Sequence, residues 1–366
     1  MPHPGRAPAD VLVAGHICLD VIPSLSGPAT IEPGGLVRVG QAALATGGAV
    51  ANTGLALHRL GVPVRLLGKV GDDLFGGAVL DALDAHGLSN GTIVAPGETT
   101  SYSIVINPPG VDRCFLHCPG ANDTFAADDV PVEALEGVRA FHFGYPPLMR
   151  RMYADGGAEL ERLFARARAA GAVTSLDLSW PDPATEAGLV DWRAVLARTL
   201  AHVDVFSPSL DELLFMLDRP AHDRGAGDGA TDPDLLGRLA GDAVAMGAAV
   251  VAIKLGERGL YLRTADDVAG LCDRLGLDRQ AWRAREILTP CFQARTVAGT
   301  TGAGDCTIAG LLAALLRGDG PAEAAIAAVA VGACSVEAAD ATSGIPPWPE
   351  VAIRLAAGWP RLSATT

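Results

Sequence analysis

The amino-acid sequence predicts an α/β protein built on a mostly parallel sheet with helices on both faces. Short runs of β-forming residues alternate with longer segments rich in Ala and Leu, the order expected of strand–helix–strand units. Several short runs are apolar almost throughout, as expected for strands that are covered on both faces. No internal repeat or convincing linker divides the chain, so we treat residues 1–366 as a single domain. The expected strands are 11–15, 64–70, 138–143, 172–177, 203–206 and 249–255.

Composition narrows the function classes. The net charge of -14 opposes non-specific attraction to nucleic acid or to an anionic membrane. The seven cysteines form no CxxC pair, which favours reduced thiols over a disulfide framework or a zinc site. The uncharged stretch 324–336 is shorter than the roughly 20 residues that span a bilayer. We therefore expect a cytoplasmic protein with no nucleic-acid partner and no membrane partner.

Two regions, about 18–45 and 98–120, break the strand–helix alternation. The first is rich in Pro, Gly and β-forming residues, and the second reads as two strands around a Pro-Pro-Gly turn. Together they predict a small sheet that projects from the main body and serves as a lid; an ordinary edge hairpin is the alternative. We expect the polar segment 219–234 to be a surface loop and 264–293 to be a partly packed insertion without an assigned role.

The segment 296–317, TVAGTTGAGDCTIAGLLAALLR, carries the strongest chemical signal. A helix is expected after Gly304, with Gly318 as its stop. The first backbone N–H groups of such a helix lack partners and carry partial positive charge, so an anion fits in front of them. Its predicted apolar face consists of Ile308, Leu311, Leu312 and Leu315.

An acidic residue lies beside this predicted anion site. Gly302 and Gly304 let the backbone approach a phosphoryl group, and Asp305 places a carboxylate at the same spot. A carboxylate repels a transferring phosphoryl group, but it is useful there if it accepts the proton of the attacking hydroxyl. The alternative is purely structural, with Thr300 or Thr301 and Asp305 capping a helix after a tight turn.

The TTGAGD segment resembles the second signature of the ribokinase-like, phosphofructokinase-B type carbohydrate kinases. This resemblance implies that Gly302, Ala303 and Gly304 form an anion hole and that Asp305 is the catalytic base. It also implies ATP and Mg²⁺ as cofactors. The implied fold is a ribokinase-like three-layer α/β/α sandwich with a small β-sheet lid, which relatives often use for dimer contacts. We therefore expect a homodimer that forms through the lid.

The segment 46–61, TGGAVANTGLALHRLG, is similar to the family's other signature, a Gly-Gly and an Asn at the start of a helix. Gly47 and Gly48 allow a tight approach, and Asn52 lies one helical turn further on, so its amide could reach a ligand above the glycines. The alternative is a plain turn at a helix start. The resemblance implies that these positions bind the sugar.

Weaker matches follow in the order that the family shows. Asp20 in GHICLD, Arg113 and Asn122 match positions that face the substrate in relatives. The alternatives are a turn cap for Asp20 and a solvated strand residue for Arg113. The segment KLGERG, 254–259, resembles the family's nucleotide-side strand and turn. The implied nucleotide-binding residues are Lys254, Gly256, Gly259, Thr300, Thr301 and Ser209.

Three positions depart from the family pattern. Gly299 stands where relatives often carry an Asp in a loop associated with a monovalent cation, which argues against activation by potassium. Ser209 stands where Asn is common, and Glu212 three residues on is expected to act on Mg²⁺ through water. The segment SLDLSW keeps Asp177 but has Ser179 in place of a common Asn, so details of the substrate pocket are expected to differ.

The sequence thus predicts an ATP-dependent kinase that phosphorylates a hydroxyl of a small sugar or sugar acid. Walker, HExxH and first-strand GxGxxG patterns are absent from the sequence, which argues against the enzyme classes that use them. One alternative is a nucleoside kinase in which Tyr102, Phe115 or Phe125 stacks on the base. A second is a catalytically silent sugar-binding sensor. The sugar itself is not predicted.

Overall fold

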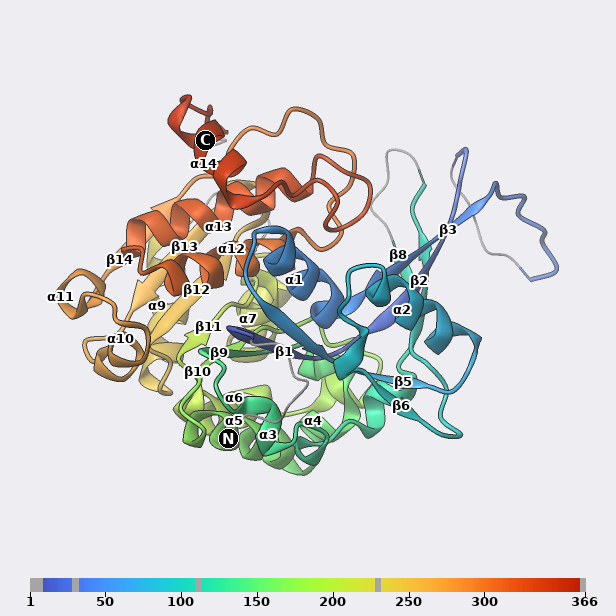
Figure 1. Cartoon of the computed structure of the whole chain (residues 1–366), viewed down its shortest axis with the longest axis horizontal. Helices are drawn as coiled ribbons and strands as arrows, with labels where there is room; N and C mark the ends of the chain where they lie inside the picture. The colour runs from blue at the N-terminus through green and yellow to red at the C-terminus, as the bar shows by residue number, and fades with distance from the viewer. Residues whose placement is uncertain (1–8, 28–32, 109–113, 228–231, 363–366) are drawn as a thin grey trace.

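An eight-stranded sheet forms the centre of the molecule, and helices lie on both of its faces (Figure 1). The computed structural model describes residues 9–27, 33–108, 114–227 and 232–362. The six strands from β12 to β4 pair in parallel, whereas β13 pairs antiparallel with both β12 and the edge strand β14, which confirms the predicted α/β class. In spatial order the strands are β14 (Glu286–Thr289), β13 (Leu260–Thr264), β12 (Val250–Lys254), β11 (Val205–Phe206), β10 (Val173–Leu176), β9 (Ala140–Gly144), β1 (Val11–Gly15) and β4 (Val64–Leu67).

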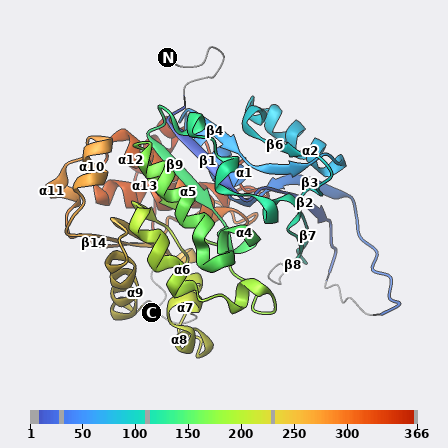
Figure 2. The same cartoon turned by 90° about the horizontal axis from the view of Figure 1, so that it is seen from below.

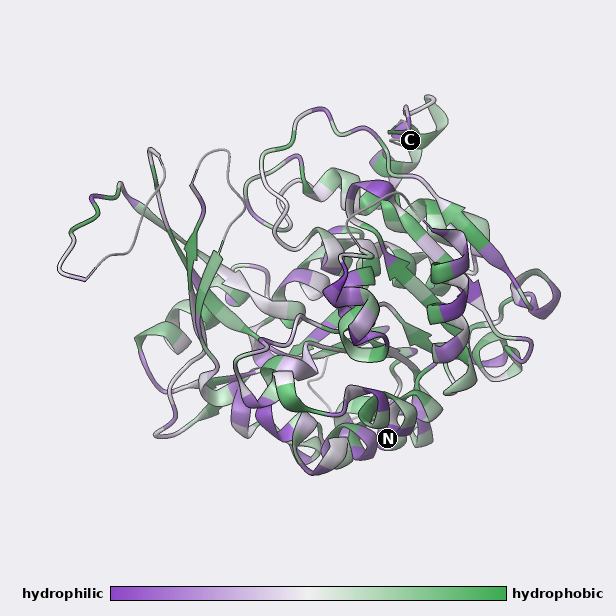
Figure 3. Ribbon diagram, turned by 180° about the vertical axis from the view of Figure 1, so that it is seen from behind, coloured by the Kyte–Doolittle hydropathy of each residue, from purple (hydrophilic) through white to green (hydrophobic). Residues whose placement is uncertain are grey.

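The two faces of the sheet pack into separate apolar cores. Val11 and Val13 of β1 point into one core, whereas Leu12 and Ala14 point into the other, as the two-residue period of a strand requires. Figure 3 shows these strands coloured largely as hydrophobic. The first core is covered by α1 (Gly48–Arg59), α2 (Leu74–Asp84), α10 (Ala269–Leu275), α11 (Arg279–Trp282), α12 (Ala303–Arg317), α13 (Pro321–Ser335) and α14 (Trp348–Ala356).

The second layer lies in front of the sheet in Figure 2. The helices of this layer are α3 (Val132–Leu135), α4 (Arg150–Tyr153), α5 (Ala158–Ala169), α6 (Trp192–Thr199), α7 (Leu210–Leu217), α8 (Arg219–Asp223) and α9 (Pro233–Ala245).

None of the helices within the described ranges is both long and apolar enough to cross a membrane.

A separate four-stranded sheet, which we call the lid sheet, projects from the body beside α2 (Figure 1). Its strands β7 and β8 are antiparallel, as the sequence predicted for this hairpin. Leu44, Phe115 and Leu116 on this sheet are about half exposed or more. The order of the strands is β3 (Ala42–Gly47), β2 (Cys18–Pro23), β7 (Tyr102–Ile106) and β8 (Cys114–Cys118).

Two expectations about secondary structure were wrong. The strand predicted at 64–70 is two strands, β4 and β5 (Lys69–Gly71), because the chain leaves the main sheet at Gly68 and β5 pairs instead with β6 (Ile93–Ala95). A Cβ at Gly68 would lie 2.5 Å from a buried side chain, so the crossing needs glycine. The loop predicted at 219–234 contains α8 and the start of α9, whose N-termini are capped by Asp218 and Asp232.

The segment 264–293, which had no assigned role, completes one side of the body. It contributes α10, α11 and the edge strand β14. Trp282 of α11 is 1% exposed in the first core and anchors the segment there. The insertion is therefore packed into the body through α10 and α11 and joined to the main sheet through β14.

Candidate active site

Helix α12 begins at the glycine turn that the sequence singled out. Gly302 is its N-cap, with a φ of 72° in the left-handed region, and a Cβ there would lie 2.4 Å from the Ala341 Cβ. Gly302 supplies no side-chain cap, and the Ala303 N–H donates to the Thr300 carbonyl. Gly302, Ala303 and Gly304 are partly exposed at the helix N-terminus, where the N–H groups of a first helical turn are expected to lack intrahelical partners.

The Asp305 carboxylate is almost fully buried at the start of this helix, with 1% of the residue exposed. Asn52 Nδ2 and the Tyr145 hydroxyl both donate to its Oδ2, at 2.9 and 2.8 Å. Its Oδ1 accepts no hydrogen bond from any residue in the described part of the chain. Burial raises the pKa of Asp305, whereas the charge of Lys254 and the two hydrogen bonds oppose that rise.

The start of α1 brings the other predicted signature to the same place. A Cβ at Gly47 would lie 2.4 Å from Asp20 Oδ2, so the glycine allows the carboxylate of β2 to approach the turn. A Cβ at Gly302 would lie 3.2 Å from the Asn52 amide, so α1 and α12 meet at their N-terminal ends. Asn52 and Asp305 are 253 residues apart in the sequence and in contact in the fold.

A buried ion pair lies on the other side of the glycine turn. Lys254 Nζ, at the end of β12, donates to Asp177 Oδ1 at 2.6 Å, and the Asp177 side chain is fully buried. A Cβ on Gly304 would lie 3.5 Å from the same Nζ. Burial lowers the pKa of Lys254, but the charges of Asp177 and Glu212 raise it above its ordinary value, so the ammonium stays charged. A fixed cation here can balance negative charge on an anion held by the turn.

Ser209 and Glu212 cap α7 beside this ion pair. The Glu212 N–H donates to Ser209 Oγ, and Glu212 Oε2 accepts the Ser209 N–H at 2.7 Å, forming a capping box. No group of three or more metal-ligating side chains occurs among the residues that the structure describes. Mg²⁺ in phosphoryl-transfer sites is held mostly by phosphates and water with one or two carboxylates, so a single carboxylate such as Glu212 fits that ion.

The residues predicted to bind the nucleotide include the turn between β12 and β13. Gly259 has a φ of 110°, and a Cβ there would lie 2.0 Å from the Thr289 carbonyl oxygen. Gly256 also has a positive φ, and its carbonyl accepts a hydrogen bond from Cys291 Sγ at 3.3 Å. Thr301 is partly exposed at the start of the anion turn. Whether these residues hold a nucleotide stays a prediction.

The predicted residues on the lid side have mixed positions. Asp20 accepts a hydrogen bond from Cys18 Sγ at 3.4 Å and lies against the start of α1. The Asn122 amide bonds to the backbone of Ile17, at 2.9 Å to its carbonyl and 3.3 Å from its N–H. Asn122 therefore holds the connection between β1 and β2 in place, and its contact with substrate stays a prediction. Arg113 lies outside the described residues.

Sequence reasoning missed Tyr145, which contacts Asp305, and two histidines that are linked to Tyr145 through ring contacts. The Nε2 atoms of His16 and His117 lie 3.4 Å apart and join the body to the lid sheet. The Tyr145 ring lies 5.9 Å from the His16 ring, between centroids. Tyr145 follows β9 directly and His16 follows β1. Ligands in open α/β sheets bind at the carboxyl ends of strands, and this signal could have identified both residues.

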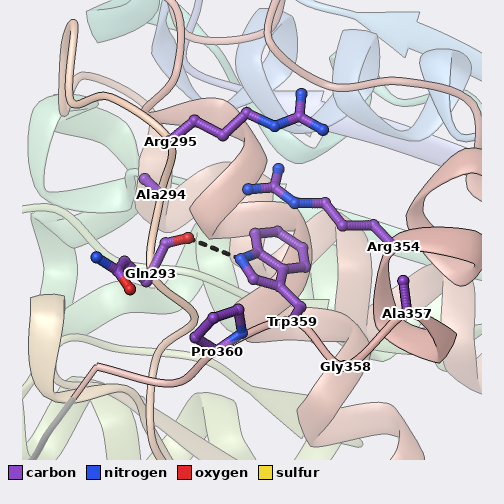
Figure 4. A pocket seen from close by; sticks show the side chains of 8 residues that line it. All are labelled: Gln293, Ala294, Arg295, Arg354, Ala357, Gly358, Trp359 and Pro360. Atoms are coloured by element: carbon purple, nitrogen blue, oxygen red, sulfur yellow. Dashed lines mark hydrogen bonds between the residues drawn. The ribbon is translucent and has the colours of Figure 1, made fainter.

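Two hollows in the described surface lie away from Asp305. The larger, of about 370 Å³, contains Arg354, which is paired with Glu337 at 2.7 Å and stacked over Trp359 at 3.4 Å (Figure 4). The smaller has a volume of about 310 Å³. The larger hollow is lined by Gln293, Ala294, Arg295, Arg354, Ala357, Gly358, Trp359 and Pro360. The smaller is lined by Trp180, Asp211, His222, Gly225 and Gly227.

Comparisons with known proteins agree with this geometry. A family model described as pfkB family carbohydrate kinase matches residues 8–348. A protein of Archaeoglobus fulgidus described as an uncharacterized sugar kinase is 27% identical over 296 residues, which cover 80% of this chain and 98% of that protein.

Solved structures show the same fold. A ribokinase of Arabidopsis thaliana, solved with ribose and ATP, superposes with a TM-score of 0.73 at 20% identity over 96% of this chain and 99% of that chain. A nucleoside kinase of Burkholderia thailandensis, solved with inosine, gives 0.68 at 20% identity over 95% and 98%. The fold is therefore ribokinase-like, and since the family model spans most of the sequence, this chain belongs to the PfkB family of carbohydrate kinases.

Proposed function

We propose that the protein transfers the γ-phosphoryl group of ATP to a hydroxyl of a small sugar or sugar acid, with Asp305 as the general base. One observation carries this proposal: a buried carboxylate, whose Oδ1 accepts no hydrogen bond from the residues that the structure describes, stands in the first turn of a helix whose N-cap is a glycine. The carboxylate is placed to take a proton, and the turn beside it is placed to hold an anion.

The proposed mechanism assigns a task to each group. Asp305 Oδ1 accepts the proton of the substrate hydroxyl as that hydroxyl attacks. The N–H groups of the 302–304 turn and the ammonium of Lys254 stabilise the charge on the transferring phosphoryl group. Mg²⁺, when bound, would neutralise phosphate charge, and Glu212 would hold it through water. Asp20 and Asn52 would orient the sugar.

A nucleoside kinase is the second candidate, because a neighbour of the same fold was solved with inosine. That function needs an aromatic side chain to stack on the base. Phe125 is fully buried in the second core, and Tyr102 packs edge-on against Phe75 at 5.1 Å between centroids. Phe115 is about half exposed on the lid sheet and is the remaining aromatic of the three that the sequence offered. These positions favour the sugar over the nucleoside.

The test is a panel of sugars, sugar acids and nucleosides assayed by ADP release, with and without K⁺ because of Gly299. Asp305→Asn should lower turnover by about 10² to 10⁴ while ATP still binds, the scale for losing a general base. Asp81→Asn, on the exposed surface of α2, is the matched control and should behave as wild type. Near-normal turnover of Asp305→Asn would remove that residue from the proposed role.

We further propose a cytoplasmic location and a homodimer that forms through the lid sheet. Each of the seven cysteines is a free thiol, which suits a reducing compartment. The exposed side chains of Leu44 and Leu116 supply apolar surface for a second copy. Sedimentation of Leu116→Lys should give a monomer where the wild type gives a dimer. A wild-type monomer at all concentrations would reject the dimer.

A further inference from the structure

The two oxygens of the Asp305 carboxylate have different surroundings. Oδ2 accepts hydrogen bonds from Asn52 and from Tyr145, whereas Oδ1 accepts none from the described residues. We propose that Tyr145 is a positioning residue that, together with Asn52, holds Oδ2 and leaves Oδ1 as the proton acceptor. As a statement about catalysis, this inference rests on the proposed function.

The backbone fixes where the Tyr145 hydroxyl lies. Tyr145 has φ 67° and ψ 41°, a left-handed conformation that costs a non-glycine residue energy and persists only where the surroundings enforce it. Its N–H donates to the Asp177 carbonyl at 3.3 Å, and its own carbonyl accepts the Leu148 N–H at 3.0 Å. Pro146 follows and begins the next helical turn. The hydroxyl is thus delivered to Asp305 by a tightly constrained turn.

Close packing below the site brings the two donors together. A Cβ at Gly144, the last residue of β9, would lie 2.2 Å from the Ala49 Cβ, so glycine lets the first turn of α1 approach the end of β9. Asn52 lies one turn further along α1, and Tyr145 is the residue after Gly144. Both donors therefore reach the same oxygen of Asp305 from different elements.

The chemistry of these groups suits a fixed base. Burial, followed by the charge of Asp305, raises the pKa of Tyr145 well above its ordinary value, so the phenol keeps its proton and remains a donor. Hydrogen bonds to a carboxylate favour its ionised form, and here they oppose the effect of burial on the pKa of Asp305. Two donors on Oδ2 occupy that oxygen, so an incoming proton goes to Oδ1. The titratable groups that face Asp305 are Lys254, Asp177, Glu212, Tyr145 and Cys306.

Tyr145→Phe removes this hydroxyl and keeps the ring. Carbon-13 NMR of the aspartate carboxyls, with the Asp305 signal assigned by its loss in Asp305→Asn, reads the pKa without any turnover. We expect the pKa of Asp305 to rise by roughly one to two units, the size of one lost hydrogen bond to a charged group. Tyr153→Phe is the matched control, because Tyr153 packs against Trp192 away from the acid, and it should leave the titration unchanged.

Kinetics supply the second readout. In Tyr145→Phe the acidic limb of the pH profile of kcat/KM should move up by the same amount as the NMR titration. Turnover should fall about tenfold with little change in KM, since the lost interaction acts on the base and not on substrate binding. If Tyr145 had a merely structural role, the acidic limb of the kcat/KM profile would stay at the same pH in Tyr145→Phe.

Two results would overturn the inference. One is an unchanged Asp305 titration in a folded Tyr145→Phe protein. The other is a higher kcat/KM in Tyr145→Phe with no shift in the acidic limb of its pH profile. That result would mean that the tyrosine hydroxyl occupies the place of the substrate hydroxyl. If Tyr145→Phe does not fold, fluorotyrosine can be incorporated in place of tyrosine, which makes the phenol a stronger hydrogen-bond donor. The pKa of Asp305 should then fall, and an unchanged pKa would refute the proposal. Absence of ADP release with every acceptor would reject the proposed function, while the NMR titration still decides the hydrogen bond.

Discussion

Removing the charge of Lys254 should destabilise the protein by an amount that depends on pH. Its Nζ lies 2.6 Å from Asp177 Oδ1, and the Asp177 side chain has no exposed surface. Lys254→Met keeps most of the apolar stem and leaves the carboxylate buried without its cation. Loss of one partner of a buried ion pair costs roughly 3–5 kcal/mol of unfolding free energy, and we expect the variant to fall in this range at neutral pH.

The direction of the pH dependence follows from the buried acid. Burial raises the pKa of Asp177 above its ordinary value, and the charge of Lys254 opposes that rise, so the pKa must rise further in Lys254→Met. A carboxyl with a raised folded-state pKa binds its proton more tightly in the folded protein than in the unfolded chain. The loss of unfolding free energy caused by the ionised Asp177 is therefore absent below about pH 4. Above that pH the loss grows by about 1.4 kcal/mol per pH unit until the folded-state pKa of Asp177 is passed.

The assay is unfolding by urea, followed by tryptophan fluorescence, at about pH 5 and about pH 8 on either side of the expected change. The stability gap between wild type and Lys254→Met should be wider at the higher pH. Asp177→Asn is the control, because it removes the buried negative charge. The Lys254 ammonium that remains is 13% exposed and still has the charge of Glu212 nearby. An equal gap at both pH values, or an Asp177→Asn protein as unstable as Lys254→Met, would refute the reasoning.

Glycine substitutions supply further tests. Gly302→Ala places a methyl group 2.4 Å from a neighbouring carbon, and we expect the disturbed anion turn to lower the rate of ADP release by about 10² or more. Gly318 at the other end of α12 is also left-handed but has open space around it. Gly318→Ala is therefore the control and should cost only about 1 kcal/mol of unfolding free energy. Equal turnover of the two variants would contradict this. Gly47→Ala should displace Asp20 and raise the KM for the sugar about tenfold. The control is Gly77→Ala on α2, where a methyl group meets no neighbour; it should leave KM unchanged and stabilise the helix by up to about 1 kcal/mol. Equal KM values for the two variants would exclude the proposed contact between Asp20 and the sugar.

Local patterns were enough to predict the elements that carry the site. The apolar face of α12 repeats with the helical period, its N-terminal glycines precede it, and Gly318 ends it in a left-handed conformation. The parallel strands were visible because burial on both faces makes their sequences continuously apolar. The strand predicted at 64–70 failed at Gly68, because apolar composition does not tell which sheet a strand joins.

The sequence by itself determined that a bare helix N-terminus and an acidic residue occur together near Asp305, since those features lie within one turn of the chain. Only the tertiary structure decided which groups meet that acid. Asn52 lies 253 residues away and Tyr145 lies 160 residues away, and the Lys254–Asp177 pair spans 77 residues. Contacts between side chains so far apart depend on how the strands are ordered and how closely α1 packs on β9, and no local pattern encodes either. Asp305 could therefore be singled out from its neighbours in sequence, but the hydrogen bonds from Asn52 and Tyr145 that oppose the effect of burial on its pKa could not.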